Sequence, residues 1–117
     1  MSRYRTTKKA QMSNNNRIIS VGYCNLQYLL SCVEPYAYSA GTYGWSCDYY
    51  ELPRGLRVST GYDTCGKHVE YDLLKKYDEA AERICRETWQ YDERRKRLNA
   101  LIEDFAGDVE RRYFSGR

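Results

Sequence analysis

The strongest constraint on this fold is the stretch from Val69 to Tyr113, which contains no proline and only one glycine, Gly107. Apolar or aromatic residues recur in it every seven positions, a period that predicts helix: Tyr77, Ile84, Tyr91, Leu98 and Phe105. A continuous helix of ~40 residues would be about 60 Å long at 1.5 Å per residue. A compact domain of this size has a radius of gyration of only about 13 to 14 Å. The helix must therefore break into a hairpin, or project as an arm and pair with another chain.

Sequence features weigh against both arrangements. The stripe beside the heptad positions includes Arg95, which disfavours a clean coiled coil between two long helices. The polar stretch WQYDERRKR, where a hairpin would have to turn, contains neither proline nor glycine. We therefore expect residues 69–114 to be helical, either as one helix that could form a homodimer or as a helical hairpin.

Residues 36–62 show a different pattern, rich in tyrosine and cut by two turn signals, Gly41 to Gly44 and Pro53 to Gly55. Aromatic and β-branched residues between such turns predict three short antiparallel strands. Proline can preset one backbone angle of the second turn, and glycine can supply a positive one. On the second strand, period two places Trp45, Cys47 and Tyr49 on one face, and we expect this face to pack against the helices.

Before this region, Leu26, Leu29, Leu30 and Val33 recur at helical spacing until Pro35 stops the pattern. They predict a short helix with Asn25 or a neighbour as its N-cap. Residues 1–18 are polar and basic without an apolar period, and predict a flexible arm. The expected fold is α+β, in a single domain spanning 19–117: a short N-terminal helix, a three-stranded antiparallel sheet, and a long C-terminal helix or helical hairpin.

The net charge of +3 is unevenly placed, because residues 1–20 hold five basic residues and no acid. No apolar run approaches the ~20 residues that span a bilayer, and the start of the chain lacks the apolar region of a signal peptide. We therefore expect an intracellular protein. Five cysteines at irregular spacing do not form a disulfide framework, and we expect reduced thiols.

Motifs for metal binding and catalysis are weak. Cys65 and His68 form a Cys-x-x-His pair, but a structural zinc site needs a second close pair, which is missing. The same two residues could act as a nucleophile and its general base, but no third group that would orient the base is evident. The glycines of GTYGW are not followed by the lysine and serine of a phosphate-binding loop. We expect no metal, no cofactor and no enzymatic activity.

Binding explains the composition better, because Tyr, Trp and Arg are the residue types that dominate contact hot spots. The residues expected to bind a partner protein are Tyr43, Trp45, Tyr50, Arg94, Arg95, Lys96 and Arg97. Basic and aromatic residues also interleave in the N-terminal arm, which suggests nucleic-acid binding as an alternative. The residues of that alternative are Arg3, Tyr4, Arg5, Lys8 and Lys9.

The segments NLQYLL, YSAGTYGW, DYYEL and STGY, within about residues 25–67, resemble small tyrosine-rich proteins of unknown role from bacterial phages and other mobile elements. This resemblance implies a non-enzymatic protein of the bacterial cytoplasm. It also implies an anti-CRISPR-like role, in which the chain would bind and inhibit a host defence protein such as an RNA-guided nuclease. The alternative is a small basic nucleic-acid-binding regulator of the mobile element.

Overall fold

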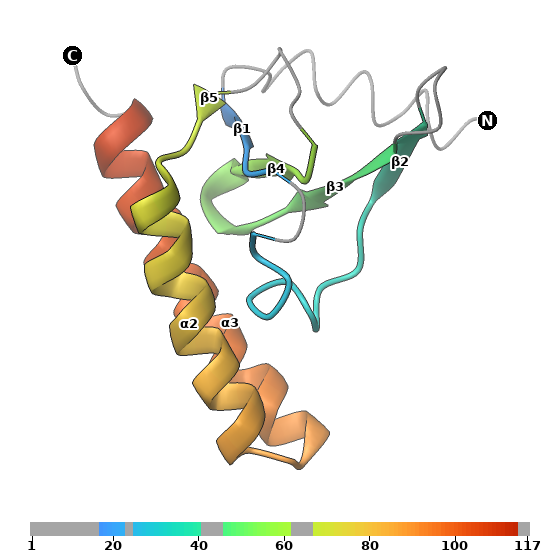
Figure 1. Ribbon diagram of the computed structural model, residues 1–117, viewed down its shortest axis with the longest axis vertical. Coiled ribbons are helices and arrows are strands. Elements are labelled where there is room, and N and C mark those ends of the chain that lie inside the picture. The colour runs from blue at the N-terminus through green and yellow to red at the C-terminus, as the bar shows by residue number, and fades with distance from the viewer. Residues whose placement is uncertain (1–16, 23–24, 41–45, 62–66, 115–117) are drawn as a thin grey trace.

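The computed structural model describes residues 17–22, 25–40, 46–61 and 67–114 (Figure 1). It confirms the α+β class, with a mixed five-stranded sheet and two helices packed as a hairpin. The strands lie in the order β2-β3-β4-β1-β5. The elements are β1 (Ile18–Ser20), β2 (Ala37–Ala40), β3 (Ser46–Glu51), β4 (Arg57–Ser59), β5 (Lys67–His68), α2 (Tyr71–Glu87) and α3 (Tyr91–Val109).

The tyrosine-rich region forms the antiparallel part of the sheet, β2-β3-β4. Between β3 and β4 the chain turns through a short 3₁₀ element, η2 (Pro53–Gly55), at the predicted turn. Two successive residues there have positive φ, 67° at Arg54 and 71° at Gly55. Glycine adopts this conformation without strain, whereas a long side chain such as that of Arg54 does so rarely.

The prediction of three strands is wrong, because β1 and β5 add a parallel part to the sheet. β1 pairs in parallel with β4 on one side and with β5 on the other. These two strands contain three and two residues, too few to show an apolar period. Their pairing with distant segments, rather than any local pattern, makes them strands.

The predicted orientation of β3 is also wrong. Tyr50 lies opposite Val58, which is fully buried in the core, and Tyr50 itself packs against that core. Because side chains alternate along a strand, Tyr49 points to the opposite face of the sheet. The face that meets the helices is therefore that of Tyr50, not that of Tyr49.

The predicted short N-terminal helix is absent, and the segment after Asn25 forms successive turns instead. A carboxylate oxygen of Asp78, on α2, accepts hydrogen bonds from the backbone N–H groups of Tyr28 and Leu29, both at 2.9 Å. Asn25 does not cap a helix, since its side-chain amide donates to the carbonyl of Val21 at 2.7 Å. The leucines of this segment are nevertheless buried, since Leu26, Leu29 and Leu30 all lie in the core.

The C-terminal run forms the hairpin, one of the two arrangements expected from the sequence. At 1.5 Å per residue, the 17 residues of α2 and the 19 of α3 are about 25 and 28 Å long. Tyr77 of α2 meets Phe105 of α3 edge to face, with ring centroids 5.2 Å apart. These positions share a heptad stripe in the sequence, and the hairpin brings them together across the helix pair.

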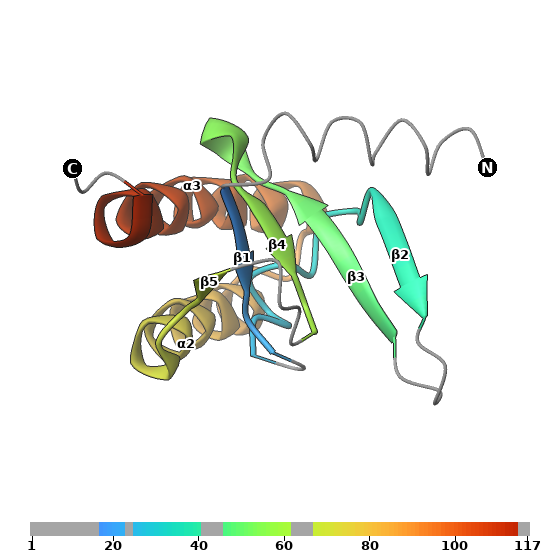
Figure 2. The ribbon, with the colours of Figure 1, turned by 90° about the horizontal axis from the view of Figure 1, so that it is seen from above.

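The core lies between one face of the sheet and the hairpin, with the turn segment on the same side (Figures 1 and 2). Its central side chains are fully buried: Ile19, Leu29, Leu56, Val58, Leu74, Leu98, Phe105 and Val109. Beyond α3 the chain continues into a short π-helical segment, η3 (Glu110–Phe114). The predicted arm ended at residue 18, but Ile18 belongs to β1, and residues 1–16 lie outside the described part of the chain.

Candidate interaction site at the tip of the helical hairpin

The connection between α2 and α3 carries the most exposed large hydrophobic side chain in the described part of the chain. Trp89 is 82% exposed, and Tyr91 beside it is 56% exposed. Figure 1 shows this end of the hairpin projecting beyond the sheet, with its lower end far from both β1 and β5. We call the segment Glu82–Arg97 the hairpin tip. Its two aromatic side chains are presented to solvent where the sheet does not cover them.

Hydrogen bonds hold the connection in place. The N–H of Thr88 donates to the carbonyl of Ile84 and closes α2, while the N–H of Arg94 donates to the carbonyl of Gln90 at the start of α3. The guanidinium of Arg97 donates to the hydroxyl of Thr88 at 2.6 Å. That of Arg94 reaches the carbonyl of Trp89 at 3.5 Å. The connection that carries the two aromatic side chains is therefore stabilised by hydrogen bonds within the hairpin.

The charges of the tip are mixed. Arg86 pairs with Glu82, and Arg97 lies 3.9 Å from Glu87. The guanidinium carbon of Arg94 lies 5.9 Å from the centre of the Tyr91 ring. Two further cations, Arg95 and Lys96, are exposed. Two carboxylates, Asp92 and Glu93, lie in the first turn of α3, where the helix dipole favours negative charge. The tip is not a continuous basic stripe, and its composition matches a protein-contact surface.

The structure places the predicted binding residues in different environments. Arg94 to Arg97 all lie at the tip, where two brace the connection and Arg95 and Lys96 are left facing solvent. Tyr43 and Trp45 lie outside the described residues. The residues of the nucleic-acid alternative, Arg3, Tyr4, Arg5, Lys8 and Lys9, also lie outside them.

Tyr50 lies in the body of the fold, away from the tip. It packs against the core and lines a cavity of about 380 Å³ between β3 and the turn segment. Burial, followed by the negative charges of Asp48 and Glu34, raises the pKa of the Tyr50 hydroxyl. Because only part of its ring is accessible, Tyr50 offers less contact area than Trp89 does.

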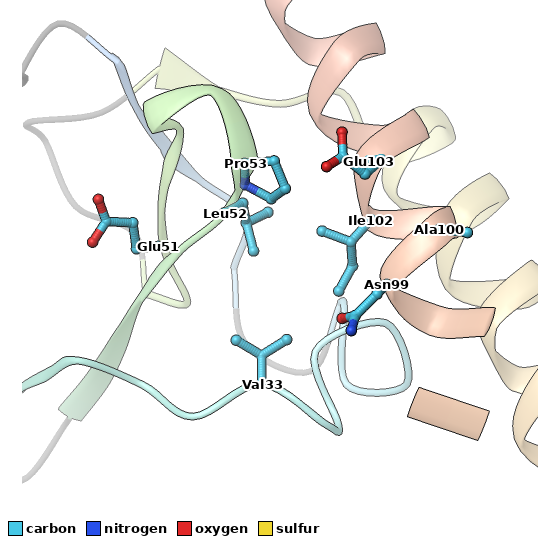
Figure 3. A pocket seen from close by; sticks show the side chains of 8 residues that line it. All are labelled: Val33, Glu51, Leu52, Pro53, Asn99, Ala100, Ile102 and Glu103. Carbon is cyan, nitrogen blue, oxygen red and sulfur yellow. The ribbon is translucent and has the colours of Figure 1, made fainter. Parts of the chain in front are cut away.

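A second hollow, of about 430 Å³, lies between α3 and the end of β3 (Figure 3). Leu52 and Ile102 point toward one another across it, and Val33 closes its lower side. Glu103 stands at the rim beside Pro53, whereas the carboxylate of Glu51 points away. The floor is apolar and the rim carries one inward carboxylate. This hollow could receive an apolar side chain, but its polar groups do not point toward a common position where a substrate could react.

The described residues contain no cluster of three or more His, Cys, Asp or Glu side chains that could hold a metal ion. Of the Cys-x-x-His pair, Cys65 is outside the described residues and His68 is an exposed residue of β5. The carboxylate of Asp78 is half-buried, and this burial raises its pKa. The hydrogen bonds from the backbone N–H groups of Leu29 and Tyr28 act in the opposite direction and lower the pKa. Those two hydrogen bonds give it a structural role as a cap for the turn segment.

Sequence reasoning missed the exposure of Trp89 and Tyr91, although both aromatic residues were visible beside the basic run. A signal for the break did exist: Arg86 lies in the last turn of α2, and Asp92 and Glu93 lie in the first turn of α3. Basic residues are favoured at helix C-termini and acidic residues at N-termini. A change from one to the other across a few residues therefore marks a helix boundary without proline or glycine.

No helix in the described part of the chain is long and apolar enough to cross a bilayer. Comparison with known proteins gives no match: no protein-family model, no curated protein and no solved structure resembles this chain significantly.

Proposed function

We propose that this chain is a non-enzymatic interaction protein that binds a partner protein through the hairpin tip. The observation that carries the proposal is Trp89, 82% exposed beside Tyr91 on a braced, projecting connection. A large aromatic side chain in water loses the favourable free energy of burial, which a partner surface can restore. Because the connection is already held by hydrogen bonds, little ordering entropy is lost when it docks.

The biological role that we propose follows from the sequence resemblance. The chain acts as a phage or mobile-element protein that inhibits a host defence protein, such as an RNA-guided nuclease. The channel that holds nucleic acid in such nucleases is itself positive, so the mixed charges of the tip do not suit it. The tip docks instead on a protein surface outside the channel, and inhibition is stoichiometric.

Affinity capture from bacterial lysate, with and without nuclease treatment, tests the contact surface. The tip variant combines Trp89→Ala and Tyr91→Ala. The matched control combines Tyr38→Ala and Tyr71→Ala, because these rings are 60% and 62% exposed elsewhere on the molecule. The proposal expects one protein partner that resists nuclease treatment and is retained by wild type and control but lost by the tip variant.

The affinity and inhibition can then be measured with the purified partner. Hot-spot aromatic residues each contribute about 2 kcal/mol or more to the free energy of binding, so loss of one should raise Kd by about 30-fold. If the partner is an RNA-guided nuclease, adding the wild-type chain at equimolar amounts should stop target cleavage. A partner held equally by the tip variant would show that the contact lies elsewhere. Material that disappears on nuclease treatment would refute protein binding.

A further inference from the structure

A stripe of charged and small residues follows the face of α3 that points away from the core. Steps of three and four residues place its members on one side of the helix: Glu93, Lys96, Ala100, Asp104 and Gly107. We call these residues the charged stripe. Its first four members are exposed, whereas the core-facing side of the same helix is buried. This face of α3 is therefore open to solvent over most of its length.

The charges of the stripe are not neutralised within the helix. On α2, by contrast, Lys75 pairs with Glu79 one turn away, at 3.7 Å. Lys96 and Asp104 are eight residues apart, which is about 12 Å along the axis, so they cannot contact each other. Within the described ranges of the chain, no residue forms an ion pair with Glu93, Lys96 or Asp104. Three charges on an ordered helix are thus left for a partner.

The C-terminal end of the stripe is positive. A Cβ atom added at Gly107 would lie 3.6 Å from a guanidinium nitrogen of Arg111 and 3.8 Å from one of Arg54, so both cations lie beside this glycine. Each arginine also pairs with a carboxylate, that of Asp108 or Glu110, yet the Arg111 side chain remains 71% exposed. From the start of α3 onward, the stripe is therefore negative, positive, neutral, negative and positive.

This order of charges makes the stripe complementary to a second copy of itself. Lys96 and Asp104 each lie four residues from Ala100, and Glu93 and Gly107 each lie seven residues from it. If two copies of α3 pack antiparallel about Ala100, every charge faces one of opposite sign on the other copy. Parallel packing would instead bring like charges together. The pattern therefore has the self-complementarity that a two-fold symmetric interface requires.

We propose that the charged stripe docks a second copy of this chain, in an antiparallel pair of α3 helices centred on Ala100. Lys96 of each copy pairs with Asp104 of the other, and Glu93 meets the guanidinium groups beside Gly107 of the other. The small side chain of Ala100 allows the two helix axes to approach to about 8 to 10 Å, the usual distance for packed helices.

The dimer leaves the aromatic residues of the hairpin tip accessible. Tyr91 shares its side of α3 with Leu98 and Phe105, opposite to the charged stripe. Because the two helices run in opposite directions, the two hairpin tips lie at opposite ends of the dimer. One dimer therefore offers two separate contact surfaces.

The interface is small and polar, so the dimer is weak. A single pair of helices buries less than the about 1,200 to 2,000 Å² of a standard stable interface. The one alkyl side chain of the stripe is that of Ala100. Exposed ion pairs contribute little each and are screened by salt. We expect a dissociation constant in the micromolar range that rises with ionic strength.

Sedimentation equilibrium of the full chain, from about 5 to 500 µM at low salt, tests the dimer. Wild type should shift from monomer toward dimer mass with concentration, and added salt should shift it back. Lys96→Glu and Asp104→Lys each replace two attractive pairs by two repulsive ones, so each should raise the dimer Kd by about 30-fold or more. Arg83→Glu makes the same change of charge as Lys96→Glu at an exposed position of α2, and should change Kd by less than about twofold.

A mixture of the two charge-reversed variants tests the register. A heterodimer of the Lys96→Glu chain with the Asp104→Lys chain again places opposite charges together at both contacts. Fluorescence anisotropy of one labelled variant, titrated with the other, should therefore recover the wild-type Kd to within about threefold. Circular dichroism confirms that each variant is folded, as expected for substitutions at exposed positions.

Three results would each overturn the proposal: monomer mass at every concentration, equal weakening by Arg83→Glu, or failure of the two variants to associate when mixed. The tip variant with Trp89→Ala and Tyr91→Ala should dimerise as wild type does, and loss of its dimer would place self-association at the tip instead. Dimerisation along α3 therefore stands or fails separately from partner binding at the tip.

Discussion

Replacing Arg57 by methionine should stabilise this protein. The Arg57 side chain is 4% exposed on β4, and its Nη2 atom lies 3.7 Å from a carboxylate oxygen of Glu51, which is 55% exposed. Its guanidinium carbon lies 5.4 Å from the centre of the Tyr36 ring. Among the described residues, its buried Nε and Nη1 atoms have no hydrogen-bond partner. A charged group is thus buried with incomplete compensation.

The magnitude follows from opposing terms. Methionine loses an ion pair with a largely exposed partner, worth at most about 1 kcal/mol, and a cation–π contact worth about 0.5 to 2 kcal/mol. It gains relief from desolvation of a charge and from two unsatisfied donors, each costing about 1 to 3 kcal/mol. The unbranched methionine side chain keeps most of the buried stem. We expect a net gain of about 1 to 3 kcal/mol in the free energy of unfolding.

Urea denaturation followed by far-ultraviolet circular dichroism measures this change. Arg57→Ala is the comparison, because it removes the charge and also the packing of the stem, and should be less stable than Arg57→Met. Glu51→Gln should change stability by less than about 1 kcal/mol. If Arg57→Met lowered the free energy of unfolding by more than about 1 kcal/mol, the guanidinium would be well compensated and this reasoning would be refuted.

Three further predictions concern the hairpin and its contacts. Phe105→Ala should cost about 3 to 5 kcal/mol, because Phe105 is fully buried, whereas Trp89→Ala should stay within about 0.5 kcal/mol; thermal melts of both variants check this. Burial raises the pKa of Asp78 above its usual 3.8, so protonation of Asp78 stabilises the folded state fully below pH 3.8, and this contribution is lost as pH rises through the raised pKa. Wild type should therefore gain stability relative to Asp78→Asn on acidification. A stability difference that does not change with pH would contradict this. Burial and the hydrogen bond to Asp108 raise the pKa of Tyr77 to about 12, so wild type should keep its advantage over Tyr77→Phe below pH 10 and lose it as pH rises through 12. Ultraviolet titration should show a late tyrosine ionisation that Tyr77→Phe removes.

The helical periodicity of residues 69–114 was readable from the sequence because helix formation depends on a local repeat. Chain length then limited the arrangement to a hairpin or a projecting helix. The choice between them was decided by packing, since Tyr77 and Phe105 bury each other only when the helices fold back. The local turn signal was weak because Thr88 and Gln90 make the connection without glycine or proline.

The sheet shows where local reasoning fails. The strands around the PRG turn were predictable from tyrosine-rich segments and turn residues, but β1 and β5 are too short to leave a pattern. The predicted orientation of β3 was wrong, because a shift of one residue turns every side chain of a strand to the opposite face of the sheet. Only the packing of Tyr50 and Val58 in and against the core fixes which face is buried.

The candidate sites divide in the same way. The sequence alone determined that Arg94 to Arg97 lie close to aromatic residues, because neighbours on one helix are fixed by its geometry. Exposure of Trp89 was decided by the tertiary structure, which leaves the hairpin tip uncovered. The ion pairs of Glu110 with Arg17 and Arg54 join three distant segments, and they depend on the parallel strand β1, the η2 turn and the end of α3. No pattern within a short stretch of sequence can encode that contact, because its free energy arises only when the complete fold brings the three segments together.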